Sequence, residues 1–265
     1  DENRILAHYG LKQLNGNPRE GRLAMIQLSG VEATHISIDD IVFKIGPRIN
    51  AAGRMETGRI AVELLTAKDA KTAIRIGTEI NEHNNERKTI DRRITQEALE
   101  MVESGSCLSS GKATIVYNPQ WHKGVVGIVA SRLVEAYYKP TIVFTKSQEG
   151  LVTGSARSVH CFDLYGAIES CADLLENFGG HLYAAGLTLK EENLPEFCQR
   201  IEKFISGKII PEMQTPVVDI DAMLNFSQIT PKFLRILKQF QPFGPGNSAP
   251  VFRTDNVYDN GMGRK

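Results

Sequence analysis

Four cationic side chains lie close together in one short segment of the sequence. Lys44, Arg48, Arg54 and Arg59 fall within KIGPRINAAGRMETGR, among small residues and glycines. The forked donors of arginine beside accessible backbone amides suit a phosphate or a phosphodiester. The alternative is a surface loop whose arginines pair with neighbouring carboxylates, and the residues alone leave both interpretations open.

A second candidate site is the segment NPQWHKGVVG, which holds the one tryptophan, Trp121, next to His122 and Lys123. The pattern predicts a strand end, a loop and then a helix that starts near a glycine. The free amides and the dipole of a helix N-terminus attract anions, and Lys123 would add a positive charge. Trp121 could stack on a base, although a lone tryptophan more often packs in a core, and His122 is more often a structural hydrogen-bonding residue than a catalyst.

Two further segments combine glycine with polar side chains. In GSARS, two serines, one of them Ser155, flank Arg157 after a predicted strand, and this cluster could hold one phosphate or be a plain surface turn. In FGGHLYAAG, we expect a helix to end at Gly179 and Gly180, which would present backbone amides and His181 to a ligand. The simpler alternative for the first glycine is a helix C-cap.

The sequence contains no recognisable catalytic centre. Metal-dependent hydrolysis of phosphoesters needs carboxylates clustered with histidine, as in DxD or DHH motifs, and the sequence has none. It also lacks a P-loop, a GxSxG context and a dinucleotide fingerprint. The residues therefore predict a phosphate- or nucleic-acid-binding α/β module, with no catalytic residue and no metal ligand assigned.

Composition narrows the class of protein. The 265 residues are 42% hydrophobic, and 31 basic residues balance 31 acidic ones, so an anionic partner must be met by local basic groups. The four cysteines form no CxxC pair, which favours reduced, mostly buried thiols. No apolar run reaches the roughly 20 residues of a membrane span, and the start shows no secretory signal. We expect a cytoplasmic protein, and the start without methionine suggests a fragment.

The elements that must position these residues fall into two halves. Apolar spacing predicts helices over 3–14, 22–29 and 38–45, the last ending before Pro47, with no strand in this stretch. A long helix is predicted over 68–103, with apolar ends and a polar waist, NEHNNERKT at 81–89. A helix with a solvated waist typically bridges two domains, so we place a domain boundary inside it.

The second half alternates strands and helices. Strands over 113–117 and 141–145 with a helix over 125–138 predict a right-handed parallel βαβ unit. The remaining predicted elements are strands over 151–155, 184–189 and 216–221 and helices over 163–178, 195–205 and 231–240.

These segments, in this order, resemble the RecJ single-strand-specific DNA exonucleases of bacteria, within the DHH phosphoesterase superfamily. The resemblance rests on DENRILAHYGLKQLN, FKIGPRINAAGRM, WHKGVVGIVASRLVEAYYKPTIVF, GSARSVHCFDLYGAIESCADLLENFGGHLYAAGLTL and QPFGPGNSAPVF. It implies an α/β fold that comprises the end of a DHH domain at 1–66, a connecting helix at 67–104, a DHH-associated domain with a mixed sheet at 112–210, and a linker leading into an oligonucleotide-binding barrel at 211–265.

The resemblance also implies a function. Members are expected to hydrolyse single-stranded DNA from the 5′ end in repair and recombination, with Mn²⁺ or Mg²⁺ held by motifs that this sequence lacks, so this chain alone is expected to be inactive. Candidate partners are single-stranded DNA and a single-strand-binding protein or a helicase, with no membrane. The implied substrate-binding residues are Arg48, Asn50, Arg54, His122, Lys123, Ser155, Arg157, Gly179, Gly180 and His181.

Two other classes of function stay open. A related phosphodiesterase could act on short oligonucleotides or cyclic dinucleotides, although NAAGR and PFGPGN favour a longer DNA channel. A non-catalytic nucleic-acid-binding module is the third.

Overall fold

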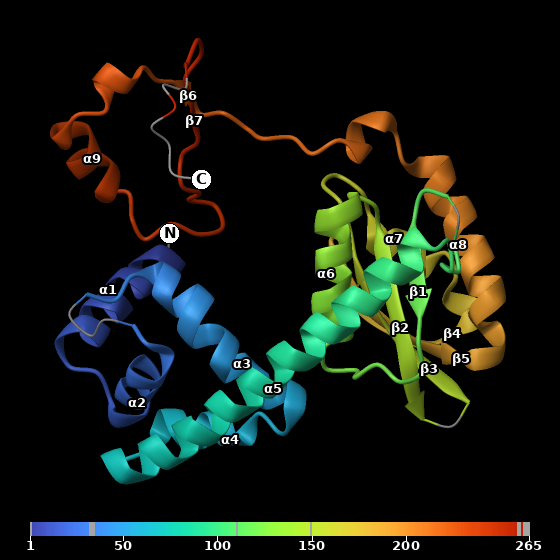
Figure 1. Cartoon of the computed structure of the whole chain (residues 1–265), viewed down its shortest axis with the longest axis horizontal. Helices are drawn as coiled ribbons and strands as arrows, with labels where there is room; N and C mark the ends of the chain where they lie inside the picture. The colour runs from blue at the N-terminus through green and yellow to red at the C-terminus, as the bar shows by residue number, and fades with distance from the viewer. Residues whose placement is uncertain (1, 32–34, 110, 149, 259–260, 262–265) are drawn as a thin grey trace. The chain divides into compact units, whose positions relative to one another are not determined.

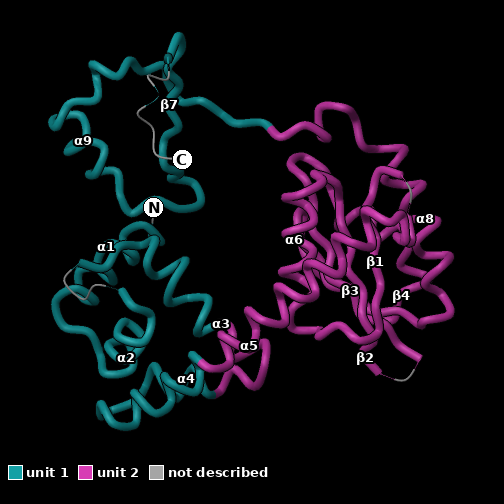
Figure 2. Tube along the Cα trace, viewed as in Figure 1, with its two compact units in different colours: residues 1–49, 60–81, 217–265 teal, residues 50–59, 82–216 magenta. Residues whose placement is uncertain are grey.

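The computed structural model describes residues 2–31, 35–109, 111–148, 150–258 and 261. It divides into two compact units, coloured separately in Figure 2: unit 1 comprises residues 1–49, 60–81 and 217–265, and unit 2 comprises residues 50–59 and 82–216. Helices α3 (Gly46–Met55) and α5 (Ala70–Glu103) each contribute residues to both. Each unit is described by itself below.

Unit 1 begins with a group of helices: α1 (Glu2–Gly16), α2 (Glu20–Ser29), the π-helical turn η1 (Asp40–Ile45) and α4 (Arg59–Thr66). Helix α2 ends where Gly30 takes a left-handed conformation, with φ of 68°, and donates to the Gln27 carbonyl. Gly21 allows α2 to approach α4, because a Cβ there would overlap the Leu64 carbonyl. Among the described residues of 2–66 there is no strand, as the sequence predicts.

The predicted helix end before Pro47 is wrong. The helical path continues from η1 directly into α3, and the Gly46 amide donates to the Ile41 carbonyl. Pro47 is the second residue of α3, at the point where the wider π-helical turn gives way to the α-helix. Proline therefore does not end the helical path here.

The C-terminal part of unit 1 contains α9 (Pro231–Lys238) and two short parallel strands, β6 (Ala222–Met223) and β7 (Phe252–Arg253). Thr230 caps α9 by accepting from the Phe233 amide at 3.2 Å. The strand predicted over 216–221 is wrong, because regular pairing starts at Ala222. The turn η5 (Phe226–Gln228) lies between β6 and α9, and the turn η4 (Pro211–Gln214) precedes this region, at the end of unit 2.

Unit 2 is built on one five-stranded sheet with the order β1-β2-β3-β5-β4 (Figure 1). Its strands are β1 (Thr114–Tyr117), β2 (Thr141–Gln148), β3 (Leu151–Arg157), β4 (Leu175–His181) and β5 (Ala184–Lys190). Strands β1 and β2 are parallel and are joined by helix α6 (Val126–Tyr137), which confirms the predicted βαβ unit. The other pairings are antiparallel, so the sheet is mixed.

Alternating side chains give the sheet two buried faces. Val116 and Val143 pack with α6 and the C-terminal half of α5. Ile115, Ile142 and Phe144 pack with α7 (Leu164–Glu169) and α8 (Leu194–Lys208). Helices on both faces explain why β1 and the first half of β2 are continuously apolar or buried.

The helix predicted over 163–178 is wrong beyond its first half. Helix α7 ends at Glu169, a 3₁₀ turn η2 follows at Ala172–Leu174, and β4 starts at Leu175. Another turn, η3 (Glu191–Asn193), leads into α8. The edge of β5 supplies hydrogen-bond partners that local sequence preference cannot anticipate, so 175–181 forms a strand.

Two further sequence expectations concern membrane-spanning helices and the cysteines. Among the described residues no helix is both long and apolar enough to span a membrane. All four cysteines are free; Cys171 and Cys198 are buried, Cys107 is half-buried and Cys161 is exposed.

Candidate anion-binding site

Unit 2 contains a cavity of about 600 Å³ between the end of α3, the loop before α6, and strands β2 and β3. Four of the predicted site residues, Arg54, His122, Lys123 and Ser155, line it. The other lining residues are Gly53, Met55, Glu56, Gly124, Val126, Ser147, Thr153 and Gly154. The structure thus brings together residues of three motifs that are far apart in the sequence, at 44–59, 118–127 and 154–158.

A tight turn holds the N-terminus of α6 against this cavity. The Gly124 amide donates to Nδ1 of His122 at 3.1 Å, and Arg54 donates to the Gly124 carbonyl at 3.1 Å. Gly124 is required here because a Cβ would overlap the Arg54 carbonyl. His122 therefore shapes the loop, as the structural interpretation predicts, and the first amides of α6 lie at the cavity wall.

Ser155 and Arg157 lie on β3 beside the first turn of α6. The Arg157 guanidinium donates to Ser155 Oγ at 3.1 Å and to the Ala156 carbonyl at 2.8 Å. A Cβ at Gly127 would lie 2.9 Å from Ser155 Oγ and 3.1 Å from an Arg157 nitrogen, so the helix start touches both residues. The sequence expectation that GSARS follows its strand is corrected, since 154–157 belong to β3 itself.

The electrostatics of this cluster favour an anion. Burial lowers the pKa of Arg157, and the positive charge of Arg54 lowers it further. Among the described residues neither arginine forms an ion pair with a carboxylate. Two arginines that form no ion pair, next to a helix N-terminus and a serine hydroxyl, match a donor set that binds phosphate, and Glu56 is the one carboxylate among the lining residues.

Strand register connects the arginine to His181. Arg157 on β3 and His181 on β4 both pair with Ala184 on β5. Residues directly opposite one another point to the same face of a sheet, so Arg157 and His181 share the face that α6 partly covers. In the next row on that face, opposite Ser155, Gly186 and Gly179 leave open space, since a Cβ at either would meet nothing within 4 Å. The face of the sheet beside Arg157 therefore carries little side-chain bulk.

Gly179, Gly180 and His181 do not line the cavity, and they are exposed on an edge strand. The predicted helix end at the paired glycines is wrong, because both lie in β4 opposite Gly186 and Ala185. Gly180 is needed for this pairing, since a Cβ would overlap the Ala184 carbonyl. The imidazole Nδ1 of His181 accepts from the Tyr183 amide at 3.4 Å.

Two other predicted residues are placed elsewhere. Arg48 belongs to unit 1, where it donates to Asn81 Oδ1 at 3.0 Å and to the Lys44 carbonyl at 2.6 Å. Asn50 is exposed on α3. Trp121 is 3% exposed and donates to Glu97 Oε2 at 2.7 Å, so it packs in the core and does not offer a face to a base.

One polar face of α5 is buried, contrary to the expectation of a waist solvated all round. Asn84 in the waist is 0% exposed, and Asp91, just beyond it, is 2% exposed. The signal was available: Asn84, Arg87 and Asp91 are spaced three and four apart, which places them on one face of a helix.

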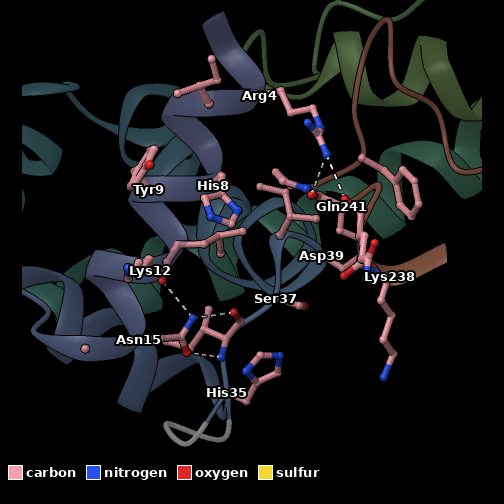
Figure 3. A pocket seen from close by; sticks show the side chains of 18 residues that line it. Arg4, His8, Tyr9, Lys12, Asn15, His35, Ser37, Asp39, Lys238 and Gln241 are labelled. Carbon is pink, nitrogen blue, oxygen red and sulfur yellow. Dashed lines mark hydrogen bonds between the residues drawn. The ribbon is translucent and has the colours of Figure 1, made fainter. Parts of the chain in front are cut away.

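A second cavity, of about 850 Å³, lies within unit 1 (Figure 3). Helix α1 lines it together with residues 35–39 and 238–243. Figure 3 shows Arg4 reaching toward the end of α9, where it donates to the carbonyls of Gln239, Phe240 and Gln241. Its guanidinium is thus occupied by backbone, and none of the substrate-binding residues expected from the sequence lies in this cavity.

The described residues do not provide a metal centre. No group of three or more His, Cys, Asp or Glu side chains among them is close enough to hold a metal ion. The unit 2 cavity is lined by Arg54, Lys123 and a single carboxylate, Glu56, which is too few acidic ligands for a divalent metal ion. A phosphate, and not a metal ion, fits this site.

Comparisons with known proteins agree with this picture. Residues 110–207 match the model of the DHHA1 domain, and residues 220–262 match that of the RecJ OB domain. The chain is 37% identical over 97% of its length to the single-stranded-DNA-specific exonuclease RecJ of Bacillus subtilis, of which it covers 33%. It is 34% identical over 94% of its length to the protein of the same name from Dickeya dadantii, of which it covers 45%.

A solved structure shares the arrangement as well. The crystal structure of RecJ in complex with Mn²⁺ from Thermus thermophilus superposes with a TM-score of 0.83 at 29% identity, over 95% of this chain and 36% of that one. The chain therefore spans between a third and a half of the curated relatives named here. Taken with the mixed sheet and the motif order, these matches show that the chain contains a DHHA1 domain and is similar, over most of its length, to a part of the RecJ exonucleases.

Proposed function

We propose that this chain is part of a 5′–3′ exonuclease specific for single-stranded DNA, and that its unit 2 receives the terminal nucleotide. The observation that carries the proposal is the cavity at the start of α6, which Arg54, Lys123 and Ser155 line and beside which Arg157 donates to Ser155, with neither arginine in an ion pair among the described residues. A 5′-terminal phosphate carries more charge than an internal phosphodiester, so this site would favour strand ends.

The neighbouring face of the sheet suits the nucleoside attached to that phosphate. Gly179, Gly186 and Ala184 present little side-chain bulk next to Arg157, and His181 stands at the far side of the same row. We assign Gly179, Gly180 and His181 to the nucleoside and Arg54, Lys123, Ser155 and Arg157 to its phosphate. His122 supports the loop, and Arg48 and Asn50 on α3 are proposed to line the DNA path.

Hydrolysis itself is assigned to the longer protein. Solved RecJ relatives are described in complex with Mn²⁺ and with Mg²⁺, whereas the described residues here offer no metal cluster. We expect divalent metal ions, held outside this chain, to supply activated water. The residues of unit 2 would bind and orient the strand end and neutralise its charge. This chain alone is expected to bind DNA and not to cut it.

The same proposal covers domain organisation and partners. The divisions are residues 1–66 as the end of a DHH domain, 67–104 as connecting helix, 112–210 as DHH-associated domain and 211–265 as linker and barrel start. We expect a cytoplasmic protein that acts in DNA repair and recombination, with a single-strand-binding protein or a helicase as candidate partners. The match to the RecJ OB domain favours this function over a phosphodiesterase for cyclic dinucleotides or short oligonucleotides, because an oligonucleotide-binding module serves a longer strand.

The test is binding of the 265-residue chain to fluorescent oligonucleotides across a salt series. We expect tighter binding to a 5′-phosphorylated single strand than to the same strand with a 5′-hydroxyl, and tighter than to a duplex of equal length. Affinity should fall as salt rises, because phosphate contacts release counter-ions. Equal affinity for both single strands, or preference for the duplex, would contradict the proposal. Mononucleotide release by this chain with Mn²⁺ would contradict the assignment of hydrolysis elsewhere.

A further inference from the structure

Residues 141–145 of β2 are all buried, and two of them, Thr141 and Thr145, are threonines at the ends of an otherwise apolar run. A valine would fill the same space without a hydroxyl that needs a partner once it is buried. The Thr145 hydroxyl has its partner outside the sheet: Oγ1 donates to the Trp121 carbonyl at 2.6 Å. This hydrogen bond joins β2 to the loop that precedes α6.

The Trp121 carbonyl lies at the junction of two turns in that loop. The Trp121 amide closes the first turn by donating to the Asn118 carbonyl at 3.2 Å, and a second turn spans residues 122–125. Thr145 therefore holds the loop where the first turn ends and the second begins. Three residues of the second turn line the cavity, and α6 follows it directly.

The strand register relates Thr145 to the opposite wall of the cavity. Thr145 pairs with Thr153 on β3, and both Thr153 and Ser155 line the cavity. Residues directly opposite one another point to the same face of a sheet, so Thr145 faces the side on which the cavity lies. Its hydrogen bond to the loop thus sets the spacing between the sheet wall of the cavity and the loop wall, which includes Lys123.

The side chain of Trp121 is held by a different contact. Its indole N–H donates to Glu97 on α5 at 2.7 Å. Replacing the indole leaves the backbone carbonyl in place, and replacing the Thr145 hydroxyl leaves the indole in place. Substitutions can therefore separate the support of the loop backbone from the packing of the tryptophan.

We propose that Thr145 is a positioning residue for the terminal phosphate, because its bond to the Trp121 carbonyl fixes where Lys123 and the first turn of α6 meet the ligand. Thr145 is 0% exposed and acts only through the loop. The inference rests on the proposed function, in which this cavity receives the 5′-phosphate. Recognition by a charge and by helix amides depends on the placement of these donors, so a displaced loop weakens the preference for a 5′-phosphate.

The test replaces the Thr145 hydroxyl by a methyl group. Thr145→Val keeps the size and branching of the side chain and removes the donor. Fluorescence anisotropy gives the dissociation constants of the 265-residue chain for a 5′-hydroxyl and a 5′-phosphorylated single strand. We expect valine to reduce the ratio of the two constants roughly fivefold, the scale of one lost hydrogen bond, and Thr145→Ser to restore it to within about twofold.

The one tryptophan of the chain gives a second readout that needs no DNA. Trp121 is 3% exposed, and its emission should move to longer wavelength in Thr145→Val, because a loosened loop admits water to the indole. Thr145→Ser should restore the emission of the unsubstituted chain. An unchanged spectrum in Thr145→Val would show that the loop keeps its place without the hydroxyl and would overturn the inference.

The matched control is Thr141→Val. Thr141 lies on the same strand and is equally buried, but its hydroxyl donates to the Lys139 carbonyl, at 2.9 Å. Because Thr141 pairs with Arg157, the control also tests whether the loss of any buried hydroxyl near the site is enough. We expect the ratio of dissociation constants and the tryptophan emission to stay as in the unsubstituted chain.

Thermal unfolding shows whether each variant is folded, and Thr145→Cys, a much weaker donor, repeats the test if the valine variant is not. An unchanged ratio in the folded variant, or an equal loss in Thr141→Val, would overturn the inference and leave the proposed function standing. Absence of a 5′-phosphate preference in the unsubstituted chain would overturn both.

Discussion

Two arginines of unit 2 show how the surroundings of one side chain decide its role. Arg200 donates to both carboxylate oxygens of Asp173, at 2.7 and 2.8 Å, and this pairing raises its pKa. Arg157 is more buried, has only neutral hydrogen-bond acceptors and faces another cation, so its pKa is lowered. The first arginine is already neutralised, and the second remains available to a ligand.

Arg157→Lys should therefore weaken binding of a 5′-phosphorylated single strand by roughly tenfold, because lysine keeps the charge but cannot reproduce the forked donor geometry of arginine. A strand with a 5′-hydroxyl should lose less affinity. The measurement is fluorescence anisotropy with both strands. Arg200→Lys serves as the control and should leave both affinities unchanged. Equal losses in the two variants would show that Arg157 acts only through the fold.

Trp121 provides a prediction about stability without an effect on DNA. Its indole N–H donates to the Glu97 carboxylate at 2.7 Å inside the cluster that joins α5 to α6. Trp121→Phe removes this donor and should lower the free energy of unfolding by about 1–3 kcal/mol. Denaturant unfolding measures this change. DNA affinity should stay unchanged, and a large loss of affinity in a folded variant would instead indicate base stacking.

The cysteines separate by burial and by thiol pKa. Burial raises the pKa of Cys198 to about 12, so at about pH 8 its thiol is protonated as well as inaccessible. Cys161 is exposed. We expect iodoacetamide to label Cys161 within minutes and to leave Cys198 unmodified until the chain is unfolded. Peptide mass spectrometry of native and denatured samples measures this difference, and rapid native labelling of Cys198 would contradict the packing of α8.

At the scale of elements, the start of α6 is the feature on which the candidate site depends. Its first turn contacts Ser155 and Arg157 because Gly127 has no side chain. A Cβ at this position would force the side chains of Ser155 and Arg157 to shift. A helix that begins at this point therefore supplies amides to the cavity and at the same time positions two side chains of β3.

Gly127→Ala tests this packing. Alanine is favoured over glycine within a helix by about 1 kcal/mol, but its Cβ would lie 2.9 Å from Ser155 Oγ. We expect weaker binding of the 5′-phosphorylated strand, with a melting temperature that changes little. Gly207→Ala in α8, where a Cβ meets nothing within 4 Å, is the control and should only stabilise. Unchanged DNA binding in Gly127→Ala would remove α6 from the site.

At the scale of the whole molecule, the two units have separate cores. Phe197 is fully buried against the sheet of unit 2, and Met25 is fully buried among the helices of unit 1. Chains with more than one core often unfold in more than one step. A substitution in one core is therefore expected to affect one step of unfolding more than the other.

Phe197→Ala should lower the stability of unit 2 by about 3–5 kcal/mol, and Met25→Ala that of unit 1 by about 2–5 kcal/mol. Hydrogen exchange followed by mass spectrometry reports protection in each unit separately. We expect each substitution to reduce protection mainly in its own unit. Equal loss of protection in both units from either substitution would show that they unfold together.

The sequence by itself determined most elements and the resemblance to the RecJ exonucleases. Apolar periodicity and turn residues placed the long helix and the parallel βαβ unit, because these patterns are local and strong. The polar motifs identified Arg54, Lys123, Ser155 and Arg157 as phosphate-binding candidates, since their chemistry is visible without a fold.

Only the tertiary structure decided where the ambiguous segments belong. Residues 175–181 form a strand because β5 offers them an unpaired edge, and the helical path passes through Pro47 because the π-helical turn before it continues directly into α3. Asp91 is buried on a polar helix, and its carboxylate pairs with Arg132 of α6, 41 residues further along the chain. Burial, pairing and counter-charge depend on residues distant in sequence, and local patterns do not record them.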